Sequence, residues 1–228
     1  MADVQSFDKI NILKRRSLPY YEYFGDMELT KEQRRRREAL ALTIEDIIMI
    51  FFNMVEVSRD MGILNEVRVK QELMTSFYEV LDSDKPYFET EEQQDKYVQD
   101  FVNETYKSTI ENLGKYPHDY DYTGNSKYWV SEDRAQFIAE NESNTIYNSA
   151  EFIEAKKQGK THKIWVTYQD DRVRPTHIEV EGARIPIDSY FDVGNARMLY
   201  PKDLTSEFST ASAYPEEYIN CRCQISYI

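Results

Sequence analysis

The sequence predicts an α+β protein, with a helical N-terminal region followed by a small C-terminal α+β domain that contains a short β-sheet. Between residues 30 and 157, apolar side chains recur with the 3.6-residue period of helices. The period then changes to that of strands, over residues 162–168, 184–187 and 223–228. With 41% hydrophobic and 14% aromatic residues, the chain has enough apolar material for a folded core.

Residues 1–29 are predicted to form an extended arm that docks on another protein. The segment has no clear helical or strand period, yet it carries Tyr20, Tyr21, Tyr23 and Phe24. Exposed aromatic rings are unfavourable in water, and a segment of this kind cannot bury them by itself. We therefore expect a partner surface to cover the rings and to order the arm on binding.

Three helices are expected in the helical region, residues 30–114, because each has a start signal and a stop signal. The first and third follow capping boxes, in which a Thr side chain and a Gln three residues later satisfy the first backbone N–H groups. The second follows an Asn N-cap. The expected spans are Thr30 to about Asp60, Asn65 to about Asp82, and Thr90 to Gly114.

A polar, tyrosine-rich loop over residues 115–130 is predicted to separate the helical region from the C-terminal domain, residues 131–228. Pro, Gly, Asn and Asp are concentrated there, as is typical of linkers. The C-terminal domain is expected to begin with a helix from Ser131. A separate short helix is expected from Ala150 to Lys157, ending at Gly159.

The net charge of −13 is unevenly distributed along the chain. Residues 1–37 contain nine Lys/Arg and six Asp/Glu, a net charge of +3, so the rest of the chain carries −16. DNA repels so acidic a surface. Contact with DNA phosphates is therefore expected only through N-terminal arginines. The alternative is that these arginines bind no DNA and simply form the solvated start of a helix. These arginines are Arg15, Arg16, Arg34, Arg35, Arg36 and Arg37.

Two other classes of binding are not expected. The glycine-rich phosphate loops G-x-G-x-x-G and G-x-x-x-x-G-K-[ST] do not occur in the sequence. The apolar run at 47–52 is too short to cross a bilayer, and Glu45, Asp46 and Glu56 flank it. We therefore predict a buried helix segment at 47–52, no membrane partner and no small-molecule substrate.

Most of the chemically distinctive residues lie in the last third of the chain. We expect His177 to belong to a buried polar network with Arg174 or Glu142, because buried donors and acceptors need partners. The alternative is a hydrolase or nuclease site made by His177, Asp171 and Glu179. An enzyme would usually show a second basic or nucleophilic group nearby, so we expect no catalytic residue.

Zinc is a further alternative for this segment. His177, Cys221 and Cys223 offer three ligands, and Asp171 or Asp192 would complete four. However, the C-x-C spacing differs from the two-residue spacing of most structural zinc sites, and the chain has only three histidines. We therefore expect neither a metal ion nor a cofactor, and two thiols that pack as small apolar groups.

The order of these residues resembles the C-terminal domain of the phage Mu F-like minor head proteins, over residues 131–225. The family pattern R-A-x-x-I-A-x-x-E occurs at 134–142, followed by Tyr147-Asn148. The family usually has Arg-Thr where this chain has Glu140-Asn141, which removes a positive charge beside Glu142. The remaining matches are Gly159, Trp165, Asp171, Arg174, His177, Gly182, Phe191, Pro215, Asn220, Cys221 and Cys223.

This resemblance implies a structural minor capsid protein, or head morphogenesis protein, of a tailed phage or prophage. Such a protein would associate with the portal and the capsid interior during assembly and DNA packaging, and would take part in genome delivery. It would be made in the host cytoplasm and located in the virion, and it would need no catalysis. Because family members are sometimes fused to effectors, the alternative is a toxin or a hydrolase- or nuclease-type enzyme that uses His177.

Overall fold

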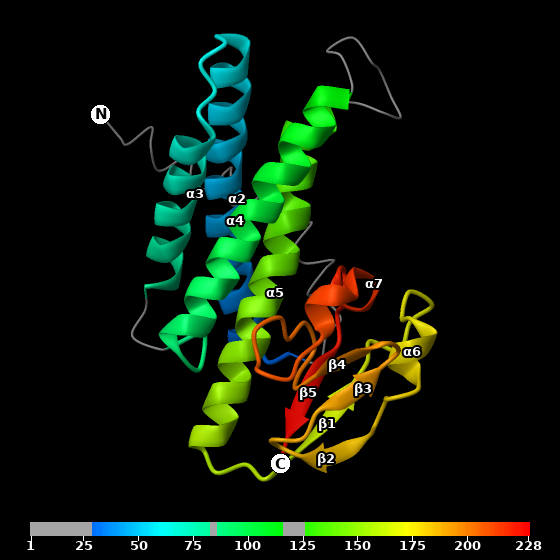
Figure 1. Cartoon of the computed structure of the whole chain (residues 1–228). Coiled ribbons are helices and arrows are strands. Elements are labelled where there is room, and N and C mark those ends of the chain that lie inside the picture. The colour runs from blue at the N-terminus through cyan, green and yellow to red at the C-terminus, as the bar shows by residue number, and fades with distance from the viewer. Residues whose placement is uncertain (1–28, 83–85, 116–125) are drawn as a thin grey trace, which may run out of the picture.

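Four long helices run beside one another, and a small module of short strands lies against one part of this bundle (Figure 1). The computed structural model describes residues 29–82, 86–115 and 126–228. A 3-10 helix, η1 (Ser126–Val130), precedes the last long helix. The long helices are α2 (Lys31–Asp60), α3 (Glu66–Leu81), α4 (Glu91–Lys115) and α5 (Glu132–Lys157).

The predicted start signals of the first three helices are confirmed. The Thr30 side chain accepts a hydrogen bond from the Gln33 backbone at 3.2 Å, and the Gln33 side chain accepts one from the Thr30 backbone at 2.9 Å. Asn65 caps α3. At α4, Thr90 accepts from the Gln93 backbone, but the Gln93 side chain accepts from the backbone of Glu89. In the second box, the Gln93 side chain therefore accepts from the residue before the N-cap, Glu89, and not from Thr90.

The predicted break before Ala150 is wrong, because α5 continues without interruption from Glu132 to Lys157. Asn148 and Ser149 are buried inside this helix. Asn residues weaken helices when their side chains compete for local backbone groups. Here the Asn148 amide instead donates to the distant Pro201 carbonyl at 2.9 Å, so a tertiary contact removes the competition and the helix continues.

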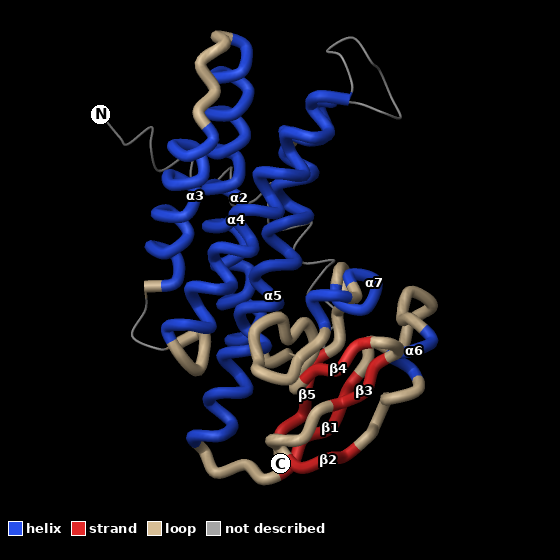
Figure 2. Tube along the Cα trace, viewed as in Figure 1, coloured by secondary structure: helices blue, strands red, loops and turns tan. Residues whose placement is uncertain are grey.

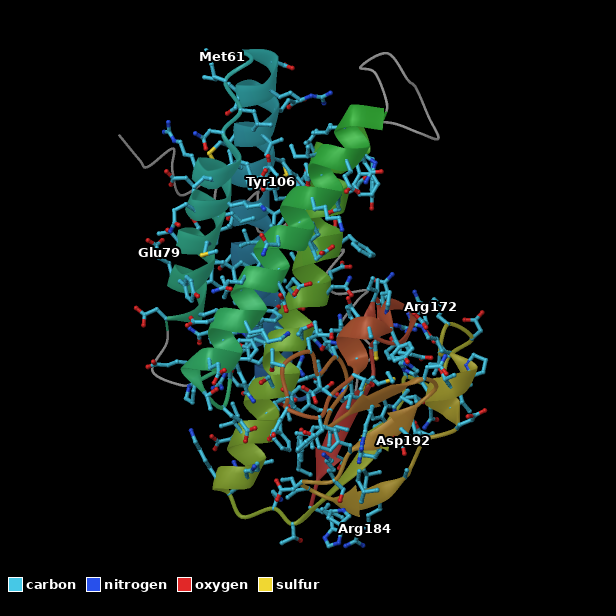
Figure 3. The ribbon with its side chains drawn as sticks, viewed as in Figure 1. Met61, Glu79, Tyr106, Arg172, Arg184 and Asp192 are labelled. Carbon is cyan, nitrogen blue, oxygen red and sulfur yellow. The ribbon has the colours of Figure 1, made fainter. Side chains whose placement is uncertain are left out.

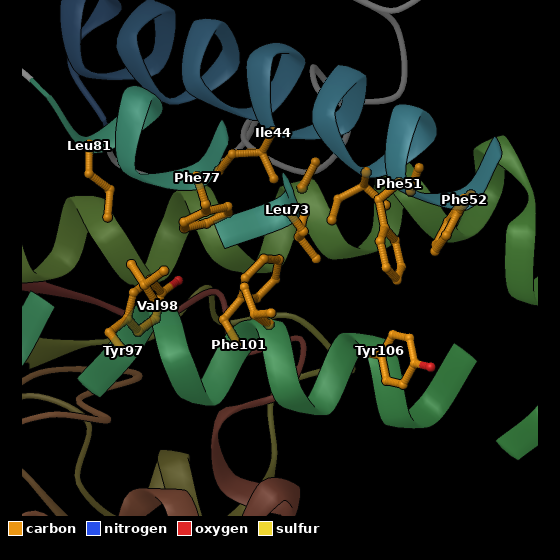
Figure 4. Packing of buried hydrophobic residues seen from close by; sticks show 14 of the residues in the cluster. Ile44, Phe51, Phe52, Leu73, Phe77, Leu81, Tyr97, Val98, Phe101 and Tyr106 are labelled. Atoms are coloured by element: carbon orange, nitrogen blue, oxygen red, sulfur yellow. The ribbon is translucent and has the colours of Figure 1, made fainter. Parts of the chain in front are cut away.

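One apolar core joins all four long helices (Figure 4). Phe77 of α3 and Phe101 of α4 have ring centroids 4.3 Å apart, and α5 adds Ala139 to the same core. Described residues on both sides of the range 116–125 therefore share this core, and the division of the chain at the predicted loop stays a prediction. In the part of the chain that the structure describes, no helix is long and apolar enough to span a bilayer.

The C-terminal module contains a three-stranded sheet and a separate hairpin (Figure 2). The central strand β1 (His162–Val166) pairs antiparallel with β2 (Arg184–Pro186) and with β5 (Gln224–Tyr227), which confirms the three predicted strands and the α+β class. The hairpin of β3 (Phe191–Val193) and β4 (Ala196–Met198) was not predicted. The short helices α6 (Pro175–Ile178), η2 (Ala211–Ala213) and α7 (Pro215–Tyr218) complete the module.

Candidate functional site

A histidine and two cysteines meet inside the C-terminal module. His177 lies on α6, and Cys221 and Cys223 lie just before β5. The His177 Nδ1 atom is 3.3 Å from the Sγ atom of Cys223 and 3.6 Å from that of Cys221. All three residues are at most 3% exposed. We refer to His177, Cys221 and Cys223 as the His–Cys cluster.

Local chain geometry places the histidine of this cluster. Pro175 occupies the first turn of α6, where a proline fits because its missing N–H has no helical partner there. Two residues further on, His177 packs against the buried Trp165 ring in an edge-to-face arrangement, with ring centroids 5.8 Å apart. The strand β1 thus contacts the imidazole through its residue Trp165.

Helix α5 fixes the cysteine segment. Asn141 accepts a hydrogen bond from the Asn220 backbone at 2.7 Å, and Asn144 donates to the Cys221 carbonyl at 3.0 Å. Asn220 has a positive φ of 58°, a conformation that asparagine tolerates better than most residues. Lys202 also donates to the Asn141 side chain at 2.8 Å. Asn141, where the sequence departs from the family pattern, therefore holds the loop before the C-x-C motif.

The carboxylate partner of His177 is Glu217, which sequence reasoning missed. The Nε2 atom of His177 is 3.2 Å from the Glu217 Oε2 atom, and the Thr176 hydroxyl donates to the same oxygen at 2.8 Å. Glu217 lies 40 positions from His177 on the four-residue helix α7. No periodic pattern links residues so far apart in the chain, so the sequence carried no signal for this pair.

The predicted partners of His177 are wrong. Glu142 accepts a short hydrogen bond from the Tyr97 hydroxyl of α4, and Arg174 donates from Nη2 to the Ile219 carbonyl. Glu142 thus connects α5 to α4, and Arg174 connects the start of α6 to the end of α7. A polar network does exist around His177, but other residues make it.

The electrostatics of the cluster favour one thiolate. A hydrogen bond from the Cys223 thiol lowers the pKa of Cys221 well below its ordinary value, and His177 reinforces the effect against the cost of burial. The same hydrogen bond, together with burial, raises the pKa of Cys223. Burial disfavours the charged imidazole, but the Cys221 thiolate outweighs it and raises the pKa of His177.

The cluster borders a small hollow at the module surface. Besides the cluster itself, the residues that line the hollow include Tyr168, Arg172, Arg174 and Arg222. Arg172 lies at the edge of the module beside α6 (Figure 3). Arg222 lies over the Tyr168 ring, 4.0 Å from its centroid, and donates to Asp170 at 2.7 Å. The His–Cys cluster and the arginine side chains thus border the same hollow.

The acidic residues proposed beside His177 lie elsewhere. Asp171, Glu179 and Asp192 are exposed. Among the described residues, the His–Cys cluster is the one group of three or more His, Cys, Asp or Glu whose ligand atoms all lie within 4.8 Å of one another. The structure therefore brings His177 to both cysteines but not to the carboxylates that the hydrolase and zinc alternatives invoked.

The arginines expected to touch DNA do not act as one set. Arg15 and Arg16 lie outside the described residues. Arg37 is buried, so it cannot reach a phosphate, and that part of the prediction is wrong. Its guanidinium forms a bidentate pair with Glu151, at 2.8 and 3.1 Å. Arg35 and Arg36 are exposed.

Comparison with models of protein families gives a match to the phage Mu protein F like protein family over residues 94–226. The matched region begins within α4 and includes all of α5 and almost the whole C-terminal module. It contains every residue of the His–Cys cluster and Glu217. No curated protein and no solved structure gives a significant match to the chain.

Proposed function

The chain belongs to the phage Mu protein F-like family, and we propose that it is a minor capsid protein that associates with the portal and the capsid interior of a tailed phage. The family is one of structural phage proteins, and membership in it indicates a phage head morphogenesis protein. Its placement at the portal, its location in the virion and a role in DNA packaging or genome delivery are parts of the proposal.

The proposal rests on an apolar tip at the end of the helical bundle that is distant from the C-terminal module. Met61, Ile63 and Val67 are 66%, 64% and 77% exposed. Met61 and Ile63 lie in the turn between α2 and α3, and Val67 lies in the first turn of α3. Met61 is far from Arg184 and Asp192 of the C-terminal module (Figure 3). Clustered exposed apolar side chains mark contact surfaces. The proposed role of this tip is to bind another phage head protein.

Burial of His177 supports a role without catalysis. His177 is 1% exposed, and the two thiols beside it, those of Cys221 and Cys223, are 1% and 3% exposed. A general acid or base must reach the proton that it transfers. The effector enzyme that was the alternative function would need this imidazole to be accessible, so the structure favours the structural role.

Two further contacts belong to the proposal. The arm, residues 1–29, would dock through its four aromatic rings, although residues 1–28 lie outside the described part. Arg35 and Arg36 would then face DNA phosphates or an acidic protein surface near the start of α2. Because Arg36 already pairs with Glu32 at 2.9 Å, its contribution would be small, and salt would weaken the contact.

Placing charges on the tip is expected to prevent incorporation into heads. The double substitution Ile63→Asp/Val67→Asp adds two carboxylates to the surface that would be buried against the partner, and unpaired buried charges are strongly unfavourable. We expect the amount of protein in purified phage heads to fall at least about tenfold, as a loss of 1.4 kcal/mol or more implies. Quantitative mass spectrometry of purified heads measures it.

Ile50→Asp is the matched control, because Ile50 has the same 64% exposed fraction as Ile63 but lies within α2, away from the tip. Thermal unfolding should show that both variants fold. Normal incorporation of the double variant would refute the role of the tip. An equal loss with Ile50→Asp would show that the effect is not specific to it.

A further inference from the structure

The ligand atoms of the His–Cys cluster already stand at the separations found around a zinc ion. In tetrahedral zinc sites, Zn–N is about 2.0–2.1 Å and Zn–S about 2.3 Å, which puts a ligand nitrogen about 3.5 Å from a ligand sulfur. The Nδ1–Sγ distances in the cluster are 3.3 and 3.6 Å. All three ligand atoms lie within 4.8 Å of one another, so one ion could contact all of them.

The second nitrogen of His177 is held in the way typical of metal-bound histidines. Zinc-bound imidazoles almost always donate their other N–H to a carboxylate or carbonyl, which fixes the tautomer and the ring orientation. Here Nε2 is 3.2 Å from Glu217, and Thr176 holds the same carboxylate oxygen. With Nε2 as the donor, Nδ1 carries the lone pair and points at both thiols.

We propose that His177, Cys221 and Cys223 bind one Zn²⁺ ion, with Glu217 as the carboxylate that orients the histidine. The surface hollow beside the cluster leaves room for a water molecule as the fourth ligand. Asp171 and Asp192 are not ligands. The proposal replaces the expectation of a metal-free chain, which rested on the spacing of the C-x-C motif and took no account of how α6 meets that motif.

The ion would act as a cross-link within the C-terminal module. It joins α6 to a segment 44 and 46 positions further along the chain. The module has only short strands and a small apolar cluster, and small domains of this kind often gain stability from a metal. Because zinc binding needs only the three side chains, this proposal does not depend on the role in phage heads.

The test uses the full chain, purified with a non-thiol reductant and without chelator from cells supplied with zinc. Elemental analysis is expected to find about one zinc per chain. After removal of the metal, Co²⁺ should produce the visible absorption of a thiolate-bound tetrahedral ion. Zn²⁺ should then abolish that absorption, because sites of this type bind zinc more tightly than cobalt.

Four variants separate the proposal from adventitious binding. Cys221→Ser and Cys223→Ser should each lose stoichiometric metal. Glu217→Gln should bind zinc about 10–100-fold more weakly, because the orienting carboxylate is lost. Asp192→Asn, an exposed carboxylate of the same module, should bind like the wild type.

The cobalt spectrum of the wild type decides the matter even if the cysteine variants fail to fold. Absence of stoichiometric zinc together with absence of the cobalt absorption would overturn the proposal and leave a hydrogen-bonded histidine–thiol pair. Zinc retained in a folded Cys221→Ser/Cys223→Ser variant would also overturn it, because the ion would then lie elsewhere.

Discussion

Replacement of Arg37 by alanine is expected to lower the free energy of unfolding by about 3–5 kcal/mol, the usual cost of removing one partner from a buried ion pair. The Arg37 side chain of α2 is completely buried. It pairs with Glu151 of α5 and also donates to Asn144 and Asn148, at 3.4 and 3.3 Å. Alanine would leave these three α5 side chains without their shared donor. Chemical denaturation measures the loss.

Arg36→Ala provides the control, because Arg36 is the neighbouring arginine but its side chain is 51% exposed and pairs with Glu32 on the same helix. Its loss should cost less than about 0.5 kcal/mol. The loss of stability caused by Arg37→Lys should lie between those of Arg37→Ala and Arg36→Ala, because lysine keeps the charge but not the bidentate geometry. If Arg37→Ala cost no more than Arg36→Ala, this guanidinium would not be what joins α2 to α5.

Replacement of Lys163 by methionine is expected to stabilise the protein by about 1–4 kcal/mol at pH 6, as exchanges of buried charges for apolar groups often do. Lys163 lies on the inward face of β1 and is completely buried. Its Nζ atom lies over the rings of Phe152 and Phe191, at 5.2 and 5.4 Å, and has no hydrogen-bond partner in the described part of the chain. Methionine would fill similar space without a charge.

The stability that Lys163→Met adds should decrease as the pH rises. Burial lowers the pKa of Lys163 from its ordinary 10.5 to about 7, although Asp203 and Asp188 oppose the shift. Between these values the unfolded chain holds a proton that the folded chain has released. The contribution of Lys163 to stability therefore rises with pH over that range, and the advantage of Lys163→Met should shrink between pH 6 and pH 10.

Unfolding curves at pH 6, 8 and 10 measure this dependence. Lys157→Met is the control, since Lys157 is exposed at the end of α5. Its effect should stay within about 0.5 kcal/mol at each pH. A Lys163→Met variant less stable than wild type at pH 6 would show that the buried ammonium is favourable where it is.

Local signals allowed much of the bundle to be predicted from the sequence. Thr30, Asn65 and Thr90 cap the first three helices as expected, because capping depends on residues within one turn. The central sheet followed from the alternation of β1 and its two neighbours. The hairpin β3–β4 has only three residues in each strand, too few for a recognisable period.

The remaining errors concern contacts between distant segments. The continuity of α5 at Asn148 depends on Pro201, the burial of Arg37 depends on Glu151, and the orientation of His177 depends on Glu217. Each pair is separated by at least 40 positions in the chain. All three members of the His–Cys cluster could be identified as candidate ligands from the sequence, but only the folded chain shows that α6 brings the histidine to both thiols.

The proposed function makes the protein a component of the phage head. The most direct measurement is its amount in heads purified by density gradient from cells producing the phage that encodes it, compared with the major capsid protein. We expect the protein to co-purify with heads at a fixed ratio, and the Ile63→Asp/Val67→Asp variant to remain soluble and unbound. A wild-type protein found only in the soluble lysate, with heads of normal composition, would contradict it.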